Sequence, residues 1–333
     1  MEDIVRRILD GYGVANYSLL PVQKGYRNQS FAARLRDGSM VNLVVYKREP
    51  DILERIKRTN AVGDYTFQHG LPARHTRHAR IVRLSSLRGE AFAALYDYLP
   101  GHTIPWEGYT MNHLKLLGKT MGDLHAALQS YENGALPDVI DEYLVIAGRM
   151  QRYFAQYGVQ RALAAKLGLA TPANTHERIV ATLNACQSLP HQQALHMDFV
   201  RSNILFDDVQ GELAVTGILD FEKTARGSVL FDIARTLAFL LVDCKYKQPD
   251  KIRKYFLYSG YRKRSHSGFQ NVVINTKTGR IDVLEALLDI FLVYDFYKFL
   301  RHNPYEPLLQ NEHFVRTRDI LVERGLLSRS HIA

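Results

Sequence analysis

Apolar and polar residues alternate along most of the first hundred residues. This period of two predicts short β-strands at residues 16–23, 30–36, 40–47, 79–84 and 90–98, with DGSM as a turn between the second and third. A single stretch, residues 51–70, has apolar residues at helical spacing and interrupts the strands. We therefore expect a small, mainly antiparallel sheet accompanied by one helix.

The pattern changes after the segment YLPGHTIPW, whose two prolines and glycine break any regular element. Apolar residues then recur at three- and four-residue spacing, which predicts helices over 111–128, 140–158, 176–189, 231–243 and 284–300. Short strand-like pieces occur at 193–197, 203–206 and 213–221. The sequence thus predicts an α+β fold with a small sheet lobe at 1–98 and a larger, mainly helical lobe at 99–333. The junction of two such lobes is a usual place for a small ligand.

Composition is that of an ordinary globular chain. Its 333 residues, 46% of them hydrophobic and 23% charged, are enough for two domains with substantial cores. The two cysteines, Cys186 and Cys244, do not have the spacing of metal ligands, and a single disulfide between them would be few for a chain of this length. MEDIVRRILDGYG does not resemble an export signal, and the apolar segment 284–300 is broken by charged residues. We expect a cytoplasmic protein without a membrane span.

The net charge of +9 is unevenly distributed. Residues 1–100 carry 16 Lys and Arg against 10 Asp and Glu, residues 101–250 carry 13 against 16, and residues 251–333 carry 14 against 8. The densest basic patch, GYRKRSH at 260–266, is best interpreted as a solvated surface loop, with a site for an anionic partner as the alternative. Nucleic acid is therefore not the expected partner, and the charge pattern leaves the oligomeric state undetermined.

The apolar run HMDFVRSNILF at 196–206 carries an acid and an amide five residues apart. Burying either without a partner costs a few kcal/mol, so their presence needs a reason. Seventeen residues after Asn203 comes the strand-like ending ILDFE, with Asp220 and Glu222. Asp198 as a base that accepts a hydroxyl proton, with Asn203 and Asp220 as magnesium ligands, is the set that phosphoryl transfer from ATP requires. The alternative is a turn in which these side chains cap backbone amides.

HMDFVRSN followed by ILDFE resembles the catalytic loop and metal motif of the aminoglycoside phosphotransferase and choline kinase-like superfamily. These small-molecule kinases share the protein-kinase fold, so the resemblance implies a two-lobed protein-kinase-like architecture and a phosphotransferase with an alcohol acceptor. It implies ATP, with GTP possible, and Mg²⁺ as cofactors. FDIARTLAFLL resembles the family's aspartate-containing helix start, which implies that buried Asp232 supports the loop, with His196 packed beneath it and Glu222 in place of a glycine.

The first lobe contains candidates for nucleotide contacts. Lys47, at the end of LVVYK, fits the lysine that pairs with the α- and β-phosphates, and an exposed strand-end lysine is the alternative. Gly25 and Asn28 in QKGYRNQS resemble the family's reduced phosphate loop, although a plain hairpin turn would also explain them. The resemblance further implies that Asp97 and Leu99, just before the linker, contact the nucleotide.

The helix expected to hold a glutamate partner for Lys47 departs from the family. Counting back from GLPAR places Asn60 where the glutamate is expected, while Glu54 and Asp64 flank it by several residues. Either a flanking carboxylate pairs with Lys47, Glu54 being the chemical favourite, or Asn60 does so as a neutral partner. A neutral partner would orient the lysine less strongly.

Three functional hypotheses follow. The first is a small-molecule kinase, whose substrate could be an aminoglycoside, an amino alcohol, homoserine or a sugar-like compound. The second is a protein kinase, for which H-R-D, D-F-G and an activation segment are missing. The third is a non-catalytic nucleotide- or RNA-binding module, suggested by the basic ends and Asn60. Aromatic and charged residues of FLVYDFYKFL could hold an ammonium group, but ordinary core packing is the favoured explanation.

Overall fold

The computed structural model describes residues 2–21, 23–24, 28–86, 89–132, 136–172, 174–263, 272–276 and 279–330. The chain forms two compact units. The first comprises Met1–Thr103 together with Ser202–Thr224, and the second comprises Ile104–Arg201 together with Ala225–Ala333. The boundary at 103 lies within the predicted linker. The division is not a single cut between 98 and 99, because the segment 202–224 packs with the first unit.

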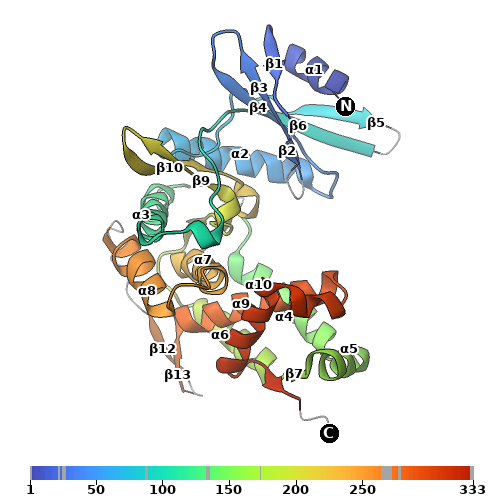
Figure 1. Cartoon of the computed structure of the whole chain (residues 1–333), viewed down its shortest axis with the longest axis vertical. Helices are drawn as coiled ribbons and strands as arrows, with labels where there is room; N and C mark the ends of the chain where they lie inside the picture. The colour runs from blue at the N-terminus through green and yellow to red at the C-terminus, as the bar shows by residue number, and fades with distance from the viewer. Residues whose placement is uncertain are drawn as a thin grey trace. The chain divides into compact units, whose positions relative to one another are not determined.

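The first unit is built on an antiparallel sheet (Figure 1). Its strands lie in the order β1-β3-β4-β6-β5, and the short β2 also pairs with β3. The elements of this part are α1 (Glu2–Gly11), β1 (Tyr17–Leu19), β2 (Gln23–Lys24), β3 (Gln29–Leu35), β4 (Met40–Val45), α2 (Ile52–Gln68), β5 (Val82–Ser86) and β6 (Gly89–Asp97). All five predicted strands and the predicted helix are present, whereas α1 was not predicted.

Alternate residues of β4 and β6 divide between the two faces of this sheet. Val41 and Leu43 of β4 belong to a core cluster that includes Val5 and Leu9 of α1. Val44, which follows Leu43, lies on the other face, in a cluster formed with α2. This two-sided burial follows from the strand's period of two and explains why β4 is apolar at nearly every position.

A hairpin completes the first unit. Its strands β9 (Ile204–Val209) and β10 (Glu212–Ile218) pair antiparallel, and the 3₁₀ turn η4 (Phe221–Lys223) follows. A bridge between His102 and Phe206 and a parallel bridge between Ala73 and Ile218 attach the hairpin to the rest of the unit. A Cβ at Gly101 would lie 2.3 Å from the Thr216 hydroxyl, and its φ of +103° is a conformation that glycine accepts readily. Backbone contacts between distant segments thus position the residues that follow β10.

The second unit is mainly helical. Its principal elements are α3 (Met111–Leu128), α4 (Val139–Phe154), α5 (Tyr157–Ala162), α6 (Thr175–Cys186), α7 (Val229–Asp243), α8 (Pro249–Arg253), α9 (Val283–His302) and α10 (Glu312–Glu323). Its short strands are β7 (Leu169–Ala170), β8 (Gln193–Leu195), β11 (Ala225–Gly227), β12 (Val273–Thr276), β13 (Gly279–Asp282) and β14 (Ser328–Arg329). The core of this unit includes α7 and α9, which pack on each other and bury most of their side chains.

Local capping explains where several of these helices begin. Thr110 forms a capping box at the start of α3, Ser228 caps α7, and Asp282 caps α9. The single helix predicted over 140–158 is instead two, because Gln156 has an extended backbone that separates α4 from α5. Helix α10 was not predicted.

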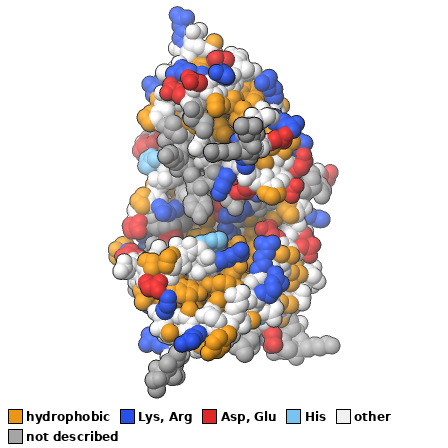
Figure 2. Space-filling view, turned by 90° about the vertical axis from the view of Figure 1, so that its right-hand side faces the viewer, with side chains coloured by type: hydrophobic (Ala, Val, Ile, Leu, Met, Phe, Trp, Pro, Cys, Tyr) orange, Lys and Arg blue, Asp and Glu red, His pale blue; other side chains and the backbone are white. Residues whose placement is uncertain are grey.

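The surface bears both signs of charge. Figure 2 shows Lys and Arg side chains interspersed with Asp, Glu and apolar side chains over the face that it presents. Within the described part of the chain, no helix combines the length and the apolar character needed to cross a bilayer.

Candidate active site

The loop that follows β8 carries the first predicted motif. β8 ends at Leu195 and pairs with β11, so the strand delivers His196 directly into the second unit's core, where its side chain is fully buried. Met197 has a φ of +58°, a left-handed conformation that non-glycine residues rarely adopt. A strained backbone persists only where its surroundings hold it, so the supports of this loop are informative.

One face of α7 supplies these supports. The carboxylate of Asp232 accepts the backbone N–H of His196 at 2.8 Å and that of Met197 at 2.6 Å. Arg235 donates from Nη2 to Oδ1 of Asp198 at 2.9 Å, and the Thr236 hydroxyl donates to the Phe199 carbonyl at 2.8 Å. The three helical residues stand at i, i+3 and i+4, the spacing that places side chains on one face. α7 therefore holds four consecutive loop residues.

Asp232 is ionised although it is almost fully buried. Burial alone would raise the pKa of its carboxyl, but the hydrogen bond from His125 and the backbone N–H of His196 outweigh it and hold the pKa below its usual value. Nε2 of His125 lies 3.1 Å from the carboxylate, and its Nδ1 lies 2.8 Å from the Tyr261 hydroxyl. The imidazole of His196 accepts the backbone N–H of Asp198 at 3.1 Å. This hydrogen bond fixes the backbone at the candidate base.

Arg235 was not anticipated from the sequence. Its side chain and that of Asp198 are 5% and 13% exposed, so the ion pair is largely removed from water. Nη1 donates to the Tyr143 hydroxyl at 3.2 Å, whereas Nε is buried without a partner among the described residues. Burial would lower the pKa of this guanidinium, but Tyr143 and Asp198 hold it above its usual range. The i, i+3, i+4 polar set in an otherwise apolar helix was the signal that could have revealed it.

The second motif lies in the first unit. Asn203 ends a short 3₁₀ turn and is buried, and its carbonyl accepts the backbone N–H of Leu219 at 2.8 Å. Asp220 comes next in the chain, with a left-handed φ of +56° and a carboxylate that accepts the N–H of Glu222 at 3.3 Å. The backbone bond across the hairpin therefore brings the two predicted metal ligands to neighbouring positions, although seventeen residues separate them.

Glu222 connects this motif to the remainder of the first unit. Asn28 donates to its Oε1 at 2.6 Å, and Nε of Arg55, on α2, lies 3.8 Å from its Oε2. Burial and the neighbouring charge of Asp220 raise the pKa of Glu222, against the opposing effects of Asn28, Arg74 and Arg55. Asn28 also accepts the backbone N–H of Lys47 at 3.1 Å. Gly25, predicted beside it, lies outside the described residues.

Among the described residues, none of the three expected partners pairs with Lys47. Glu54 pairs with Lys57 at 2.7 Å on the exposed surface of α2, and Asp64 accepts the N–H and hydroxyl of Thr76. Asn60 accepts the Tyr96 hydroxyl at 2.7 Å, and the Tyr96 oxygen lies 2.5 Å from that of Tyr46.

The period of the strand explains this correction. Tyr46 continues the register of β4 because its N–H donates to the Phe92 carbonyl, so Tyr46 lies with Val44 on the α2 face. Lys47 is therefore exposed rather than directed at Asn60. Because side chains alternate between the two faces of a strand, the sequence alone could have shown that Tyr46, and not Lys47, faces α2.

Asp97 and Leu99 lie where β6 ends. The Asp97 carboxylate is paired with Arg77 at 2.6 Å and with His75 at 2.9 Å, and Leu99 is half-buried in the following segment. Their predicted contact with a nucleotide stays a prediction.

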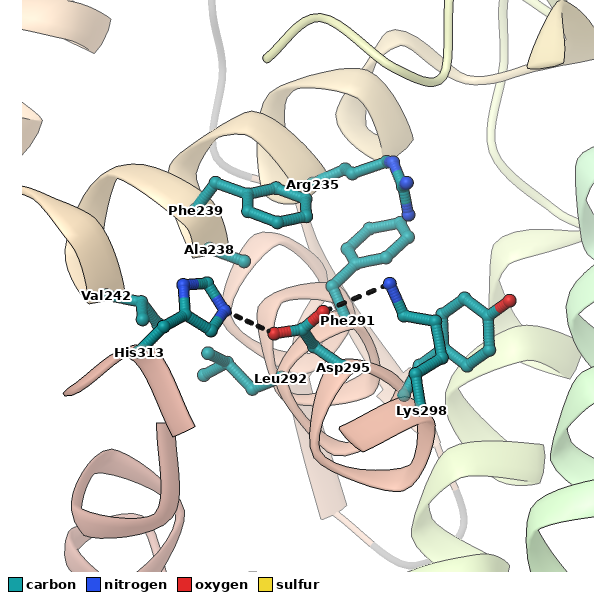
Figure 3. A pocket seen from close by; sticks show the side chains of 10 residues that line it. Arg235, Ala238, Phe239, Val242, Phe291, Leu292, Asp295, Lys298 and His313 are labelled. Carbon is teal, nitrogen blue, oxygen red and sulfur yellow. Dashed lines mark hydrogen bonds and ion pairs between the residues drawn. The ribbon is translucent and has the colours of Figure 1, made fainter. Parts of the chain in front are cut away.

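A pocket of the second unit lies beside Arg235 (Figure 3). It is a small pocket, partly open to solvent, between α7, α9 and α10. Its lining combines aromatic and charged side chains: Arg235, Ala238, Phe239, Val242, Phe291, Leu292, Tyr294, Asp295, Lys298 and His313. Arg235 joins this pocket to Asp198, since its guanidinium contacts the carboxylate and lies 5.6 Å from the Phe239 ring centroid.

His313 lies between two carboxylates at this pocket. Its Nδ1 donates to Asp243 at 2.5 Å and its Nε2 to Asp295 at 2.6 Å. Burial would lower the pKa of His313, but the two carboxylates raise it to about 9, so the ring is an imidazolium at neutral pH. Burial would raise the pKa of Asp295, but His313 and Lys298 lower it to about 2. The aspartate on FLVYDFYKFL is therefore charged and already engaged by two cations.

Comparisons with known proteins agree with this geometry. A model of the phosphotransferase enzyme family matches residues 18–248. A search of curated proteins found no match.

Solved structures share the fold over nearly their whole length. A microcompartment-associated aminopropanol kinase is 16% identical, with a TM-score of 0.68 and coverage of 98% of this chain and 99% of that one. Amicoumacin kinase hAmiN, in complex with AMP-PNP, Ca²⁺ and Ami, is 15% identical, with a TM-score of 0.64 and coverage of 98% and 97%. The GDP and kanamycin complex of APH(2")-IIia is 12% identical, with a TM-score of 0.58 and coverage of 98% and 99%. The predicted α+β, protein-kinase-like fold class is confirmed.

Proposed function

The chain belongs to the phosphotransferase enzyme family, and we propose that it moves the γ-phosphoryl group of ATP to a hydroxyl of a small molecule in the presence of Mg²⁺. The observation that supports this most strongly is the backbone bond between Leu219 and Asn203, which brings Asn203 beside Asp220. Five residues before Asn203, α7 holds Asp198 in a buried ion pair. These are the parts that phosphoryl transfer requires from a protein.

Asp198 would accept the proton of the attacking hydroxyl. Its orientation is set by the backbone bond to His196 and by Arg235, and both of these partners are buried. An ionised carboxylate has several acceptor sites, so Asp198 can accept a hydroxyl in addition to the bond from Arg235. His196 and Asp232 would be positioning residues, since their contacts hold the loop rather than a substrate.

Asn203 and Asp220 would hold the magnesium of the nucleotide. Within the described ranges, no group of three or more His, Cys, Asp or Glu side chains is arranged to hold a metal ion. One amide and one carboxylate fit Mg²⁺ well, because this ion usually keeps several waters and takes substrate phosphate oxygens as ligands. When bound, the nucleotide supplies the phosphoryl group, and Mg²⁺ partly neutralises the negative charge of its phosphates. The neighbours with AMP-PNP and with GDP make both ATP and GTP reasonable donors to test.

The acceptor would bind in the pocket beside Arg235. Asp295 is paired with Lys298 and His313, and Asp243 with His313, so these carboxylates are compensated within the protein. Binding a polycation would require these ion pairs to be exchanged. We therefore favour a neutral or singly charged hydroxyl compound with an apolar part that contacts Phe239 and Phe291, over a polycationic aminoglycoside.

The direct test is ADP or GDP release with magnesium and a panel of acceptors. The panel includes amino alcohols, homoserine, sugars, a macrolide and kanamycin, and the matched control is the Asp198→Asn protein. Acceptor-dependent turnover by the wild type alone supports the proposal. Nucleotide binding without turnover on any acceptor would instead support the non-catalytic module.

A further inference from the structure

We propose that Arg74, rather than Lys47, is the buried cation that meets a phosphate of the bound nucleotide. This inference rests on the proposed function, since it assigns a residue to the nucleotide site of that function. Its basis is the surroundings of Arg74 in the first unit.

The backbone places Arg74 beside the candidate metal ligands. Ala73 forms a parallel bridge with Ile218, and the N–H of Arg74 donates to the Ile218 carbonyl at 2.8 Å. Ile218 is two residues before Asp220. On the other side, α2 approaches closely at Gly63, where a Cβ would lie 2.3 Å from the Arg74 carbonyl oxygen. Arg74 is therefore fixed between α2 and the end of β10.

The guanidinium of Arg74 is a buried cation without full hydrogen bonding. Its Cζ lies 4.7 Å from the centroid of the Tyr96 ring, and its Nη2 is buried with no hydrogen-bond partner among the described residues. Burial would lower its pKa, but Tyr46, Tyr96 and the carboxylates of Asp220 and Glu222 hold the pKa above its usual range. A buried polar group without a partner costs free energy, so such an atom in a native site calls for an acceptor.

A phosphate oxygen satisfies this requirement. It supplies both the missing acceptor and a negative charge, and the planar guanidinium matches phosphate geometry. Magnesium bound at Asp220 and the guanidinium of Arg74 would then hold the same polyphosphate from neighbouring positions. Lys47, by contrast, is exposed, and its backbone N–H is engaged by Asn28. The sheet position that faces α2 is occupied by Tyr46, which is uncharged. Arg74 therefore supplies the positive charge on this side of the sheet.

The test measures nucleotide affinity by titration calorimetry without an acceptor, using ATP, ADP and adenosine with magnesium. Arg74→Met should weaken ATP and ADP binding about tenfold or more and leave adenosine binding within about threefold, because only phosphate contacts are lost. Lys47→Met should change ATP affinity by less than about threefold. Arg83→Met is the matched control, since Arg83 is an exposed arginine of the same unit paired with Glu90.

Each result is decisive. ATP affinity within threefold of wild type in Arg74→Met, an equal loss of adenosine binding, or a larger loss in Lys47→Met would overturn the inference while leaving the proposed function standing. Absence of ATP and GTP binding in the wild type would refute the proposed function and this inference together. Arg74→Gln, which keeps a planar hydrogen-bonding group, is assessed by the same criteria if Arg74→Met does not fold.

Discussion

His313 should make the stability of the second unit depend on pH above neutrality. Its pKa rises from 6.5 to about 9 because Asp243 and Asp295 hold both ring N–H groups. A folded-state pKa above the unfolded value means that the folded protein binds this proton more tightly. The resulting stabilisation is complete below pH 6.5 and is lost as the pH rises through 9. With the His313 side chain only 21% exposed, its size is roughly 3 kcal/mol.

The assay is urea unfolding of wild type and His313→Gln at intervals from pH 6 to pH 10. Other groups titrate in this range, but they do so in both proteins, so the difference between the two free energies of unfolding isolates His313. That difference should shrink by roughly 3 kcal/mol between pH 6 and pH 10. His302→Gln, at the exposed end of α9, is the matched control and should keep the wild-type pH dependence. Parallel curves for wild type and His313→Gln would refute the reasoning, as would an NMR titration of the His313 ring with a midpoint near 6.5.

Three further results are expected. Asp198→Asn should lower turnover by a factor of about 100 or more with nucleotide affinity retained, which initial rates and calorimetry together measure; near-normal rates would remove this residue from the mechanism. Asp220→Ala should abolish magnesium-dependent nucleotide binding and Asn203→Ala should weaken it less, because only the former removes a negatively charged ligand of the metal. Equal magnesium-nucleotide affinities of Asp220→Ala and wild type by calorimetry would contradict this. Gly63→Ala should destabilise the first unit by about 1–3 kcal/mol in thermal or urea unfolding, because its Cβ would meet a backbone carbonyl at 2.3 Å. Gly148→Ala on α4 is its control, since the nearest neighbouring atom of its Cβ would lie at 3.7 Å.

Much of the fold and part of the site could be predicted from local patterns. The period of two located the strands of the sheet, and helical spacing located most of the longer helices, because burial of one face imposes these periods on the residues themselves. The sequence also places Asp198 and Asn203 five residues apart in the chain, a spacing that does not depend on what surrounds them.

By itself, the sequence therefore determined the class of fold, the order of most of its longer elements and the motif residues that we propose for the site. Only the tertiary structure decided which side chains meet across long separations: Arg235 with Asp198, Tyr96 with Asn60, and His313 with Asp243 and Asp295. It also decided that Arg74, not Lys47, is the buried cation near Asp220. The physical reason is that periodicity reports which face of an element is buried, whereas the partner of a buried polar group depends on which elements pack against that face. That information is spread over residues far apart in the chain.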